Sequence, residues 1–398
     1  MLSLKHLMLK TTAILALVTS LAGCKKDAGE QQPVDDCSVK AGNNQSHPKA
    51  ATYQAILDKY VQKGFPGLVL YIKTPKEGVW TGAAGKARTE TDEPMRPCNL
   101  IYPQSIAKTF TAVSVMKLVE EDRISLDAPI NTYLPAPICD RIANANQATV
   151  RQLLNHTSGI RNYTQEPEYL SDVLDNRAQG MTNQKNLERV YDKPALFQPG
   201  TGYTYSNTNY LLLARIIDRV TGASHADFFA QRIFSPLGLT DIYYKNEPSY
   251  PTPAGLPNTY RDLGNGELTN VTDIETRLLA SDFGDGGMLG LASNFAKFVE
   301  AIFEGNLVSP ASRAAMTTWV EDGHSTIYGL GLIKRNTPYG YGIGHDGDGA
   351  GCVADMYYLP DSEVTIVMGA NKGLATPADT KLYREDLWNE VVRVALEK

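Results

Sequence analysis

The stretch Ser105-Ile106-Ala107-Lys108 opens a predicted helix over residues 105–121. Side chains three or four residues apart lie on one face of a helix, so the serine and the lysine point the same way. That face also carries the apolar residues Ala112, Val115 and Val119. An ammonium group there is costly unless it is paired or its pKa falls, and an amine with a lowered pKa can act as a general base. The pattern predicts a serine nucleophile with a lysine base; the plainer alternative is a helix cap and a lysine that reaches solvent.

The same Ser-x-x-Lys spacing occurs twice more, so spacing alone does not identify a nucleophile. Ser46 and Lys49 adjoin a polar segment in which no pocket is expected to form. Ser114 and Lys117 share a helical stripe with Glu121, which indicates a solvated face. The pair quoted first is therefore the better candidate.

A second candidate element is Tyr205-Ser206-Asn207, at the end of a turn-rich segment over residues 199–207 that leads into a predicted helix over 208–221. It presents a phenol and an amide from one loop. Tyr244-Lys245-Asn246 has the same spacing but lacks the glycine-rich entry and a following helix. The structural alternative for Tyr205 is an aromatic side chain that covers the core.

A third element is His345-Asp346-Gly347, at the end of a strand predicted over residues 341–345. The His-x-Gly spacing occurs once in the chain. A glycine at a strand edge lets a substrate or another backbone approach closely. The alternative is a polar hairpin turn, because Asp-Gly pairs favour turns.

The two ends of the chain carry the strand patterns, and the middle carries mostly helical ones. Helices are predicted over 50–63 and 378–396, and strands over 67–73, 78–86, 341–345, 352–359 and 364–370. Clear helical patterns in the middle cover 105–121, 208–221, 226–233 and 293–304. The predicted fold class is α/β (α+β): an antiparallel sheet built from both chain ends, with flanking helices and an inserted helical lobe over roughly 104–300.

The order of the three elements resembles that of the serine beta-lactamase and D-alanyl-D-alanine carboxypeptidase superfamily, and is most similar to the branch of class C beta-lactamases, D,D-peptidases and related esterases. Supporting stretches are Leu153-Leu154-Asn155-His156-Thr157-Ser158-Gly159, Gly286-Gly287-Met288-Leu289 and Tyr357-Tyr358-Leu359-Pro360-Asp361. The resemblance covers roughly residues 50–395 and implies a beta-lactamase/transpeptidase-like fold.

The resemblance also implies roles for the motif residues. Ser105 would attack a carbonyl after losing its proton to neutral Lys108, directly or through Tyr205, and the phenol would protonate the leaving group or activate water. The main-chain N–H groups of Ser105 and Asp348 would form the oxyanion hole. Further substrate-binding residues would be Asn207, His345 and Gly347. No metal or cofactor is implied.

Residue 346 departs from the superfamily pattern, which more often has threonine there. Asp346 and Asp348 would repel an anionic end of a substrate unless they point away or His345 is protonated. The expected substrate is a small peptide, amide or ester, with a peptidoglycan stem peptide ending in D-Ala-D-Ala as the first candidate. An esterase, a D-aminopeptidase, a beta-lactamase and a non-catalytic binder of wall fragments are the alternatives.

The N-terminus has the pattern of an export signal over residues 1–23. Lys5 and Lys10 precede a short apolar run, which ends in Leu21-Ala22-Gly23-Cys24. This box resembles that of bacterial lipoproteins and predicts lipidation at Cys24, with an ordinary secretory signal as the alternative. A polar tether over 24–48 would then link a lipid anchor to the catalytic domain over 49–398, in the periplasm or at the cell surface, with the outer membrane as the expected site.

Composition excludes several other classes of protein. The hydrophobic fraction of 42% argues against wholesale disorder, and a net charge of −6 argues against a nucleic-acid partner. The chain has no Cys-x-x-Cys and no His-Glu-x-x-His, so no metal site is predicted. His156 is expected to organise a loop. Beyond Cys24, the four cysteines allow three disulfide pairings: Cys37, Cys98, Cys139 and Cys352.

Overall fold

A computed structural model describes residue 37 and residues 46–175, 182–245, 256–321 and 327–397. In this part of the chain the main sheet has nine strands in the order β3-β2-β1-β13-β12-β11-β10-β9-β8. Every neighbouring pair is antiparallel, and β1 from the N-terminal part pairs with the last strand, β13. The predicted fold class, with a sheet built from both chain ends, is confirmed. The strands are β1 (Gly67–Thr74), β2 (Gly78–Arg88), β3 (Glu93–Pro94), β8 (Val320–Glu321), β9 (Ile327–Tyr328), β10 (Ile333–Thr337), β11 (Gly340–Asp348), β12 (Val353–Leu359) and β13 (Val364–Ala370).

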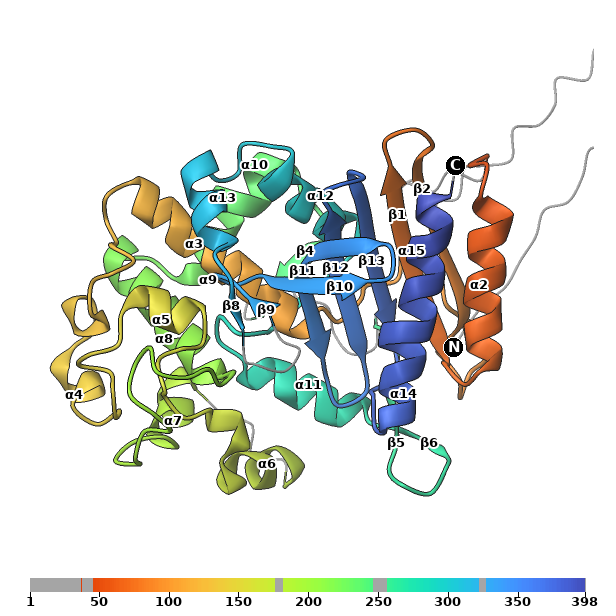
Figure 1. The fold of residues 1–398 in the computed structure, drawn as a ribbon. Coiled ribbons are helices and arrows are strands. Elements are labelled where there is room, and N and C mark those ends of the chain that lie inside the picture. Colours follow the sequence, from red (N-terminus) through yellow and green to blue (C-terminus); the bar gives the residue numbers. More distant parts are fainter. Residues whose placement is uncertain (1–36, 38–45, 176–181, 246–255, 322–326, 398) are drawn as a thin grey trace, which may run out of the picture. The chain divides into compact units, whose positions relative to one another are not determined.

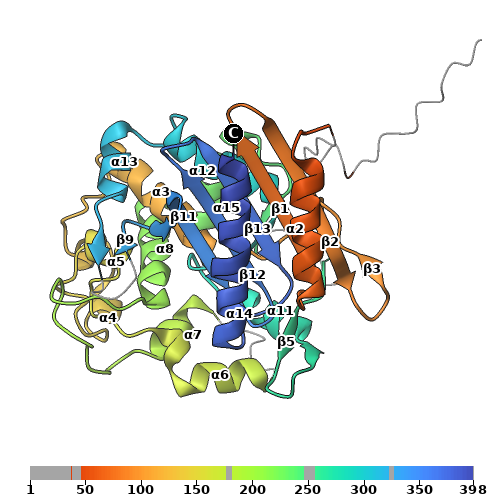
Figure 2. The ribbon, with the colours of Figure 1, turned by 45° about the vertical axis from the view of Figure 1, so that its right-hand side comes forward.

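Helices cover both faces of this sheet, which explains why its central strands are almost continuously apolar. All seven residues of β12 and of β13 are buried. On one face α2 (Ala50–Gln62) lies beside a C-terminal helical run made of α14 (Pro377–Lys381), a π-helical segment η6 (Leu382–Leu387) and α15 (Trp388–Leu396) (Figures 1 and 2). On the other face α12 (Ala292–Phe303) packs against β1, β12 and β13.

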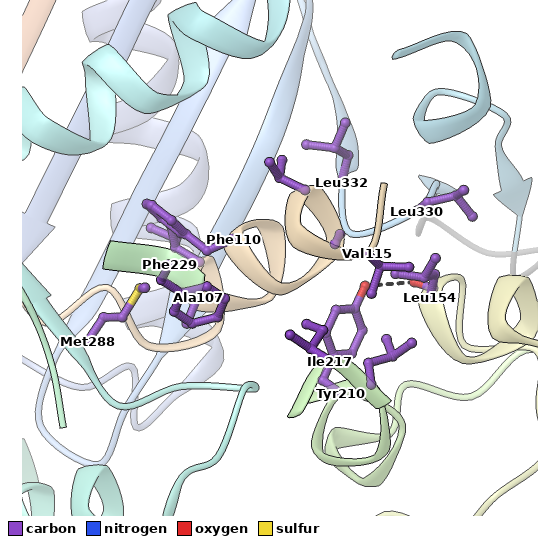
Figure 3. Packing of buried hydrophobic residues seen from close by; sticks show 14 of the residues in the cluster. Ala107, Phe110, Val115, Leu154, Tyr210, Ile217, Phe229, Met288, Leu330 and Leu332 are labelled. Carbon is purple, nitrogen blue, oxygen red and sulfur yellow. Dashed lines mark hydrogen bonds between the residues drawn. The ribbon is translucent and has the colours of Figure 1, made fainter. Parts of the chain in front are cut away.

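The helical lobe packs around α3 (Ala107–Glu120), whose residues are nearly all buried. Phe110 of α3 stacks on Phe298 of α12 with ring centroids 3.5 Å apart. Figure 3 shows Phe110 near Phe229, and the Tyr210 hydroxyl donating to the Leu154 carbonyl at 2.7 Å. The other helices are α4 (Ala136–Cys139), α5 (Val150–Leu154), α6 (Pro167–Leu174), α7 (Asn183–Glu188), α8 (Asn207–Thr221), α9 (His225–Phe229), α10 (Ser235–Leu237), α11 (Thr272–Ser281) and α13 (Pro310–Met316). Two small two-stranded antiparallel sheets pair β4 (Ile242–Tyr244) with β7 (Met288–Gly290) and β5 (Tyr260–Asp262) with β6 (Leu268–Asn270).

Two details of the sequence prediction are wrong. Strand β11 runs to Asp348, three residues beyond the predicted end at His345, so the whole His-x-Gly element belongs to the end of the strand. Ser114 and Lys117 do not form a solvated face, because neighbouring segments pack on that side of α3. Ser114 is fully buried and donates to the Phe110 carbonyl, and Lys117 donates to the Leu307 carbonyl.

The packed part of the chain includes residues that lie before the expected boundary at residue 49. Cys37 forms a disulfide with Cys98, and His47 is buried beside Tyr53. Of the remaining described cysteines, Cys139 and Cys352 are free and buried. The predicted signal over 1–23 and Cys24 lie outside the described residues. No helix in the described ranges is long and apolar enough to cross a membrane.

Candidate active site

Ser105 and Lys108 meet at the start of the central helix of the lobe. Ser105 lies in a short 3₁₀ turn, η1 (Gln104–Ile106), which continues directly into α3. The Lys108 Nζ donates to the Ser105 Oγ at 3.0 Å and to the Asp285 carbonyl at 2.9 Å. Lys108 has no solvent exposure, and this burial lowers its pKa to about 8 against the opposing effects of Asp285 and Asp282. Near neutral pH a useful fraction of this amine is therefore free to accept a proton.

The residue before the nucleophile has an unusual backbone conformation that a buried carboxylate supports. Gln104 has a φ of 52°, in the left-handed region that residues other than glycine rarely adopt. Its Nε2 donates to the Glu275 Oε1 at 2.6 Å, and the Glu275 Oε2 accepts the Gly351 N–H at 2.8 Å. Glu275 on α11 thus links the nucleophile's turn to the loop that follows β11.

Gly347 of β11 lies against the same turn. A Cβ atom there would stand 2.1 Å from the Pro103 carbonyl oxygen, so the position requires glycine. The sequence had indicated either a substrate or a backbone as the close neighbour, and the neighbour is the chain's own backbone. Gly347 therefore fixes the distance between β11 and Ser105.

Tyr205 lies beside the lysine in the segment that enters α8. The Lys108 Nζ is 5.1 Å from the centroid of the Tyr205 ring. Burial raises the pKa of Tyr205 well above 10, and its hydrogen bond with Ser105 acts in the opposite direction. The phenol is therefore neutral at physiological pH and can donate a proton but is a poor base. Lys108 is the better base of the two.

His156 packs against Tyr205 and holds the adjoining segment. The two ring centroids are 4.3 Å apart, and the His156 Nδ1 accepts the Ser206 N–H at 3.2 Å. Burial, with smaller contributions from Lys108 and His345, lowers the pKa of His156 well below 6.5. A neutral, enclosed imidazole with these contacts organises the loop.

His345 does not line the cleft, contrary to the sequence prediction. Its side chain is buried between the Tyr328 hydroxyl, 2.9 Å from Nε2, and the Asp346 carbonyl, 2.5 Å from Nδ1. Burial lowers its pKa to about 4, although Asp346 acts in the opposite direction. His345 is therefore neutral, and it acts on the cleft through Tyr328, which does line it.

The two aspartates of β11 form ion pairs with arginines that had no motif in the sequence. Arg335 of β10 contacts Asp346 at 2.7 Å and Asp355 at 2.9 Å. Arg384 of η6 contacts Asp346 at 2.9 Å and Asp348 at 2.8 Å. Burial alone would raise the pKa of Asp346, but Arg384 and Arg335 hold it below its ordinary value. The expected repulsion of an anionic substrate is therefore weaker than the sequence indicated, because Asp346 and Asp348 already have cationic partners, which they share with Asp355.

Two cavities meet at Ser105. The larger holds about 750 Å³ and the smaller about 190 Å³. Ser105, Asn207 and Asp348 line both of them. Further residues of the larger cavity are Tyr203, Tyr205, Tyr328, Ile333, Lys334, Arg335, Asn336, Asp346 and Arg384. Further residues of the smaller cavity are Gln104, Thr164, Tyr169, Leu278, Asp282, Asp285, Gly349 and Ala350. A substrate bound across Ser105 would reach into both.

The chain is similar over much of its length to known proteins. A profile of the family described as Beta-lactamase matches residues 51–387. Penicillin-binding protein 4* of Bacillus subtilis is 26% identical over 308 residues, which cover 72% of this chain but only 64% of that protein. Esterase EstB of Burkholderia gladioli is 29% identical over 277 residues, or 64% of this chain and 70% of the esterase. The crystal structure of a D-stereospecific amidohydrolase from Streptomyces sp. has a TM-score of 0.71 at 27% identity, and covers 84% of this chain and 99% of that one.

Proposed function

The chain belongs to the beta-lactamase family, and from that premise we propose that it is a serine hydrolase that forms an acyl-enzyme on Ser105. One observation carries the proposal: a fully buried lysine amine with a lowered pKa stands 3.0 Å from the serine hydroxyl oxygen. A lysine is rarely buried in this way without a chemical role.

In the proposed reaction, neutral Lys108 takes the Ser105 proton as the oxygen attacks the substrate carbonyl. The main-chain N–H groups of Ser105 and Asp348 are the proposed donors to the oxyanion, and each such donor is typically worth about 3–4 kcal/mol. The Tyr205 hydroxyl then protonates the leaving amine or alkoxide as the tetrahedral intermediate collapses, and regains a proton from the lysine. Water then attacks the acyl-enzyme from the place that the leaving group occupied. The proton transfers run in the opposite direction and return a proton to the Ser105 oxygen.

The position of the phenol assigns the two cavities to the two parts of the substrate. Tyr205 lines the larger cavity but not the smaller one. Because the leaving group must lie beside its proton donor, the larger cavity receives the leaving group and the smaller one the acyl part.

Charge in the larger cavity supports a carboxypeptidase-type reaction. Lys334 lines this cavity and forms no ion pair with the described residues, and its Nζ lies 4.6 Å from the centroid of the Tyr341 ring. If the long side chain turns from this ring into the cavity, its ammonium can hold the carboxylate of a departing amino acid. We therefore place a D-Ala-D-Ala peptide of the cell wall first. Amide and ester hydrolysis, as in the names of the amidohydrolase and the esterase, are the second candidates, because the same machinery performs them.

We also propose that the protein acts outside the cytoplasm, held by a lipid on Cys24. The lipoprotein-like box over residues 21–24 supports this, as does the disulfide Cys37–Cys98, since disulfides persist in oxidising compartments. Metabolic labelling with an alkyne fatty acid should mark the wild type and not Cys24→Ser. Equal labelling of the two would contradict the anchor.

The nucleophile is tested with a fluorescent penicillin and a fluorophosphonate. Either probe should label the wild type, and Ser105→Ala should abolish the signal. Ser114→Ala is the matched control, because Ser114 has the same Ser-x-x-Lys spacing on the same helix but no cavity. Equal labelling of wild type and Ser105→Ala would show that the assignment of Ser105 as the nucleophile is wrong.

The substrate classes are separated by a second experiment. It measures release of D-Ala from a muramyl pentapeptide beside the turnover of a p-nitrophenyl ester and of a D-amino-acid amide.

A further inference from the structure

We propose that Glu275 is a positioning residue, which sets the distance between the two main-chain N–H groups of the oxyanion hole and so controls the rate of acylation. This inference rests on the proposed function, because it takes Ser105 as the nucleophile and the N–H groups of Ser105 and Asp348 as the oxyanion donors. Glu275 itself has no solvent exposure and lines neither of the cavities that meet at the nucleophile. It therefore acts on the reaction only through the segments that it holds.

One oxygen of Glu275 holds the residue before the nucleophile. The Gln104 Nε2 donates to the Glu275 Oε1 at 2.6 Å. Gln104 has a φ of 52°, a conformation that costs free energy in a residue other than glycine and persists only where its surroundings enforce it. Gln104 and Ser105 share one peptide bond, so a relaxed backbone at Gln104 would redirect the Ser105 N–H. The bond to Glu275 opposes that relaxation.

The other oxygen of Glu275 holds the turn that follows β11. The Gly351 N–H donates to the Glu275 Oε2 at 2.8 Å. This turn begins directly after Asp348 and is closed by the Gly349 N–H, which donates to the Cys352 carbonyl at 2.9 Å. A Cβ atom on Gly349 would stand 2.7 Å from both carboxylate oxygens, so the carboxylate packs against the residue next to Asp348. Glu275 therefore fixes the end of the strand that carries the second oxyanion donor.

These contacts require a carboxylate, which accepts hydrogen bonds at both ends. A glutamine side chain has the same shape but one oxygen, so its NH₂ group would face either the Gln104 donor or the Gly351 donor. Burial raises the pKa of Glu275, and its hydrogen bonds act in the opposite direction. Glu275 forms no ion pair within the described ranges, and a buried acid without a cation is costly. The link between the two segments gives this costly group a role.

The link matters for the chemical step because the two donors lie on different segments. The oxyanion must receive both N–H groups at once, each at about 2.7–3.1 Å. A misplacement of about 1 Å can lower a rate about a hundredfold. Loss of the link between η1 and the end of β11 should therefore slow acylation, with little effect on substrate binding.

The test compares an ester with its thionoester, in which sulfur replaces the carbonyl oxygen. Sulfur is a weak hydrogen-bond acceptor, so an oxyanion hole accelerates the ester more than the thionoester. The full-length enzyme is given p-nitrophenyl acetate and p-nitrophenyl thionoacetate, and the ratio of the two acylation rates is divided by the ratio in alkaline solution. In Glu275→Gln we expect the ester rate and this corrected ratio each to fall by at least about tenfold. An unchanged ratio in folded protein would overturn the inference.

Glu390→Gln is the matched control for a carboxylate with a structural role alone. Glu390 on α15 accepts from the Lys59 Nζ at 2.7 Å and from the Tyr60 hydroxyl at 3.0 Å, both on α2, and it lines neither cavity. Its replacement should lower the melting temperature and leave the corrected ratio unchanged. If the ratio falls equally in both variants, general loosening of the fold explains the effect and the positioning role is wrong.

A second variant tests the same link from the side of the nucleophile, and is decisive if Glu275→Gln does not fold. Gln104→Met removes the donor but keeps a chain of similar length, and it should lower the corrected ratio. When it is combined with Glu275→Gln, the new amide oxygen can accept from the Gly351 N–H without facing a donor at residue 104. The combined loss should therefore be smaller than the product of the two single losses. A loss equal to that product would contradict the link.

The wild type separates failure of the inference from failure of the proposed function. If Ser105 is labelled and the wild type prefers the ester, but Glu275→Gln and Gln104→Met keep the full preference, the hydrolase stands and the positioning role is wrong. If neither the ester nor the fluorophosphonate reacts at Ser105 in folded protein, both proposals fall.

Discussion

Lys108 has a pKa lowered to about 8 by burial, so the rate of acylation should depend on pH in a defined direction. The amine must be neutral to accept the serine proton, and the rate should therefore rise as pH increases through about 8 and level off above it. The inactivation rate by a fluorophosphonate, measured from pH 6 to pH 10, gives this profile. A rate that is flat across pH 8 would contradict lysine as the base.

Removal of the amine tests the same role directly. Lys108→Ala should lower the acylation rate by at least about a hundredfold, the usual contribution of a general base. Lys117→Ala is the matched control, because this lysine lies on the same helix and donates only to the Leu307 carbonyl. Its acylation rate should stay within about twofold of the wild type. Retained acylation in Lys108→Ala would remove the lysine from the mechanism.

Gly347 should tolerate no side chain, since it adjoins the backbone before the nucleophile. In Gly347→Ala the new methyl group would meet the Pro103 carbonyl at 2.1 Å, and β11 or η1 must move. We expect a large loss of labelling rate together with a lower melting temperature. Gly342→Ala on the same strand is the control, because its Cβ would lie 3.3 Å from the Tyr357 side chain, which a small shift can relieve. Equal behaviour of the two variants would contradict the tight approach.

At the scale of single residues, the sequence predicted the site residues that belong to motifs with a recognisable spacing. Ser105, Lys108 and Tyr205 come together as their motifs indicated. Glu275 and Arg384 were missed, because each is an isolated charge on a helix, and only the tertiary structure brings it to the site. A buried acid that holds the residue before a nucleophile has no local pattern in the sequence.

At the scale of elements, periodicity predicted the long helices and the central strands, and failed where strands are short or exposed. Strand β10 shows no clear alternation of buried and exposed residues, because none of its five residues is fully buried. With β10 unpredicted, the position of Arg335 was unknown, and the two aspartates of β11 seemed unpaired. The correction to the substrate charge thus depends in part on one missed strand, and in part on Arg384, which lies in a predicted helix.

The contact between η6 and β12 should contribute strongly to stability. Arg384 is mostly buried and binds Asp355, which has no exposure, at 2.8 Å. Removing one partner of a buried pair typically costs about 3–5 kcal/mol, so Arg384→Gln should lower the free energy of unfolding by about that much. Arg393→Gln, which breaks an exposed pair with Glu397 on α15, should cost less than about 1 kcal/mol. Urea denaturation of both variants measures the difference, and equal losses would contradict it.

The same cluster should make the fold sensitive to acid. The arginines hold the pKa of Asp346 below its ordinary value, so its charged form stabilises the folded state above about pH 4, and this stability is lost as pH falls further. Asp346→Asn should therefore flatten the loss of stability between pH 4 and pH 2, whereas the exposed Asp58→Asn should not. Parallel curves for wild type and Asp346→Asn would contradict the assignment.

At the scale of the whole molecule, the sheet depends on contacts between the two ends of the chain. Residues of β1 pair with residues of β13 that lie about 300 positions later, for example Leu68 with Ala370. Bringing such distant segments together costs conformational entropy. A covalent cross-link within the N-terminal part lowers the conformational entropy of the unfolded chain, and so reduces this cost. The disulfide Cys37–Cys98 is such a link, because it encloses α2, β1, β2 and β3.

Loss of this disulfide should destabilise the protein through its unfolded state. With a sequence separation of 61, loop-closure entropy amounts to about 4 kcal/mol, so Cys37→Ser with Cys98→Ser should lower the free energy of unfolding by about that amount. Alkylation in denaturant before reduction should modify Cys139 and Cys352 but spare the bonded pair. Alkylation of all four would contradict the pairing. A loss of stability below about 1 kcal/mol would instead show that the unfolded chain gains little freedom when the link is cut.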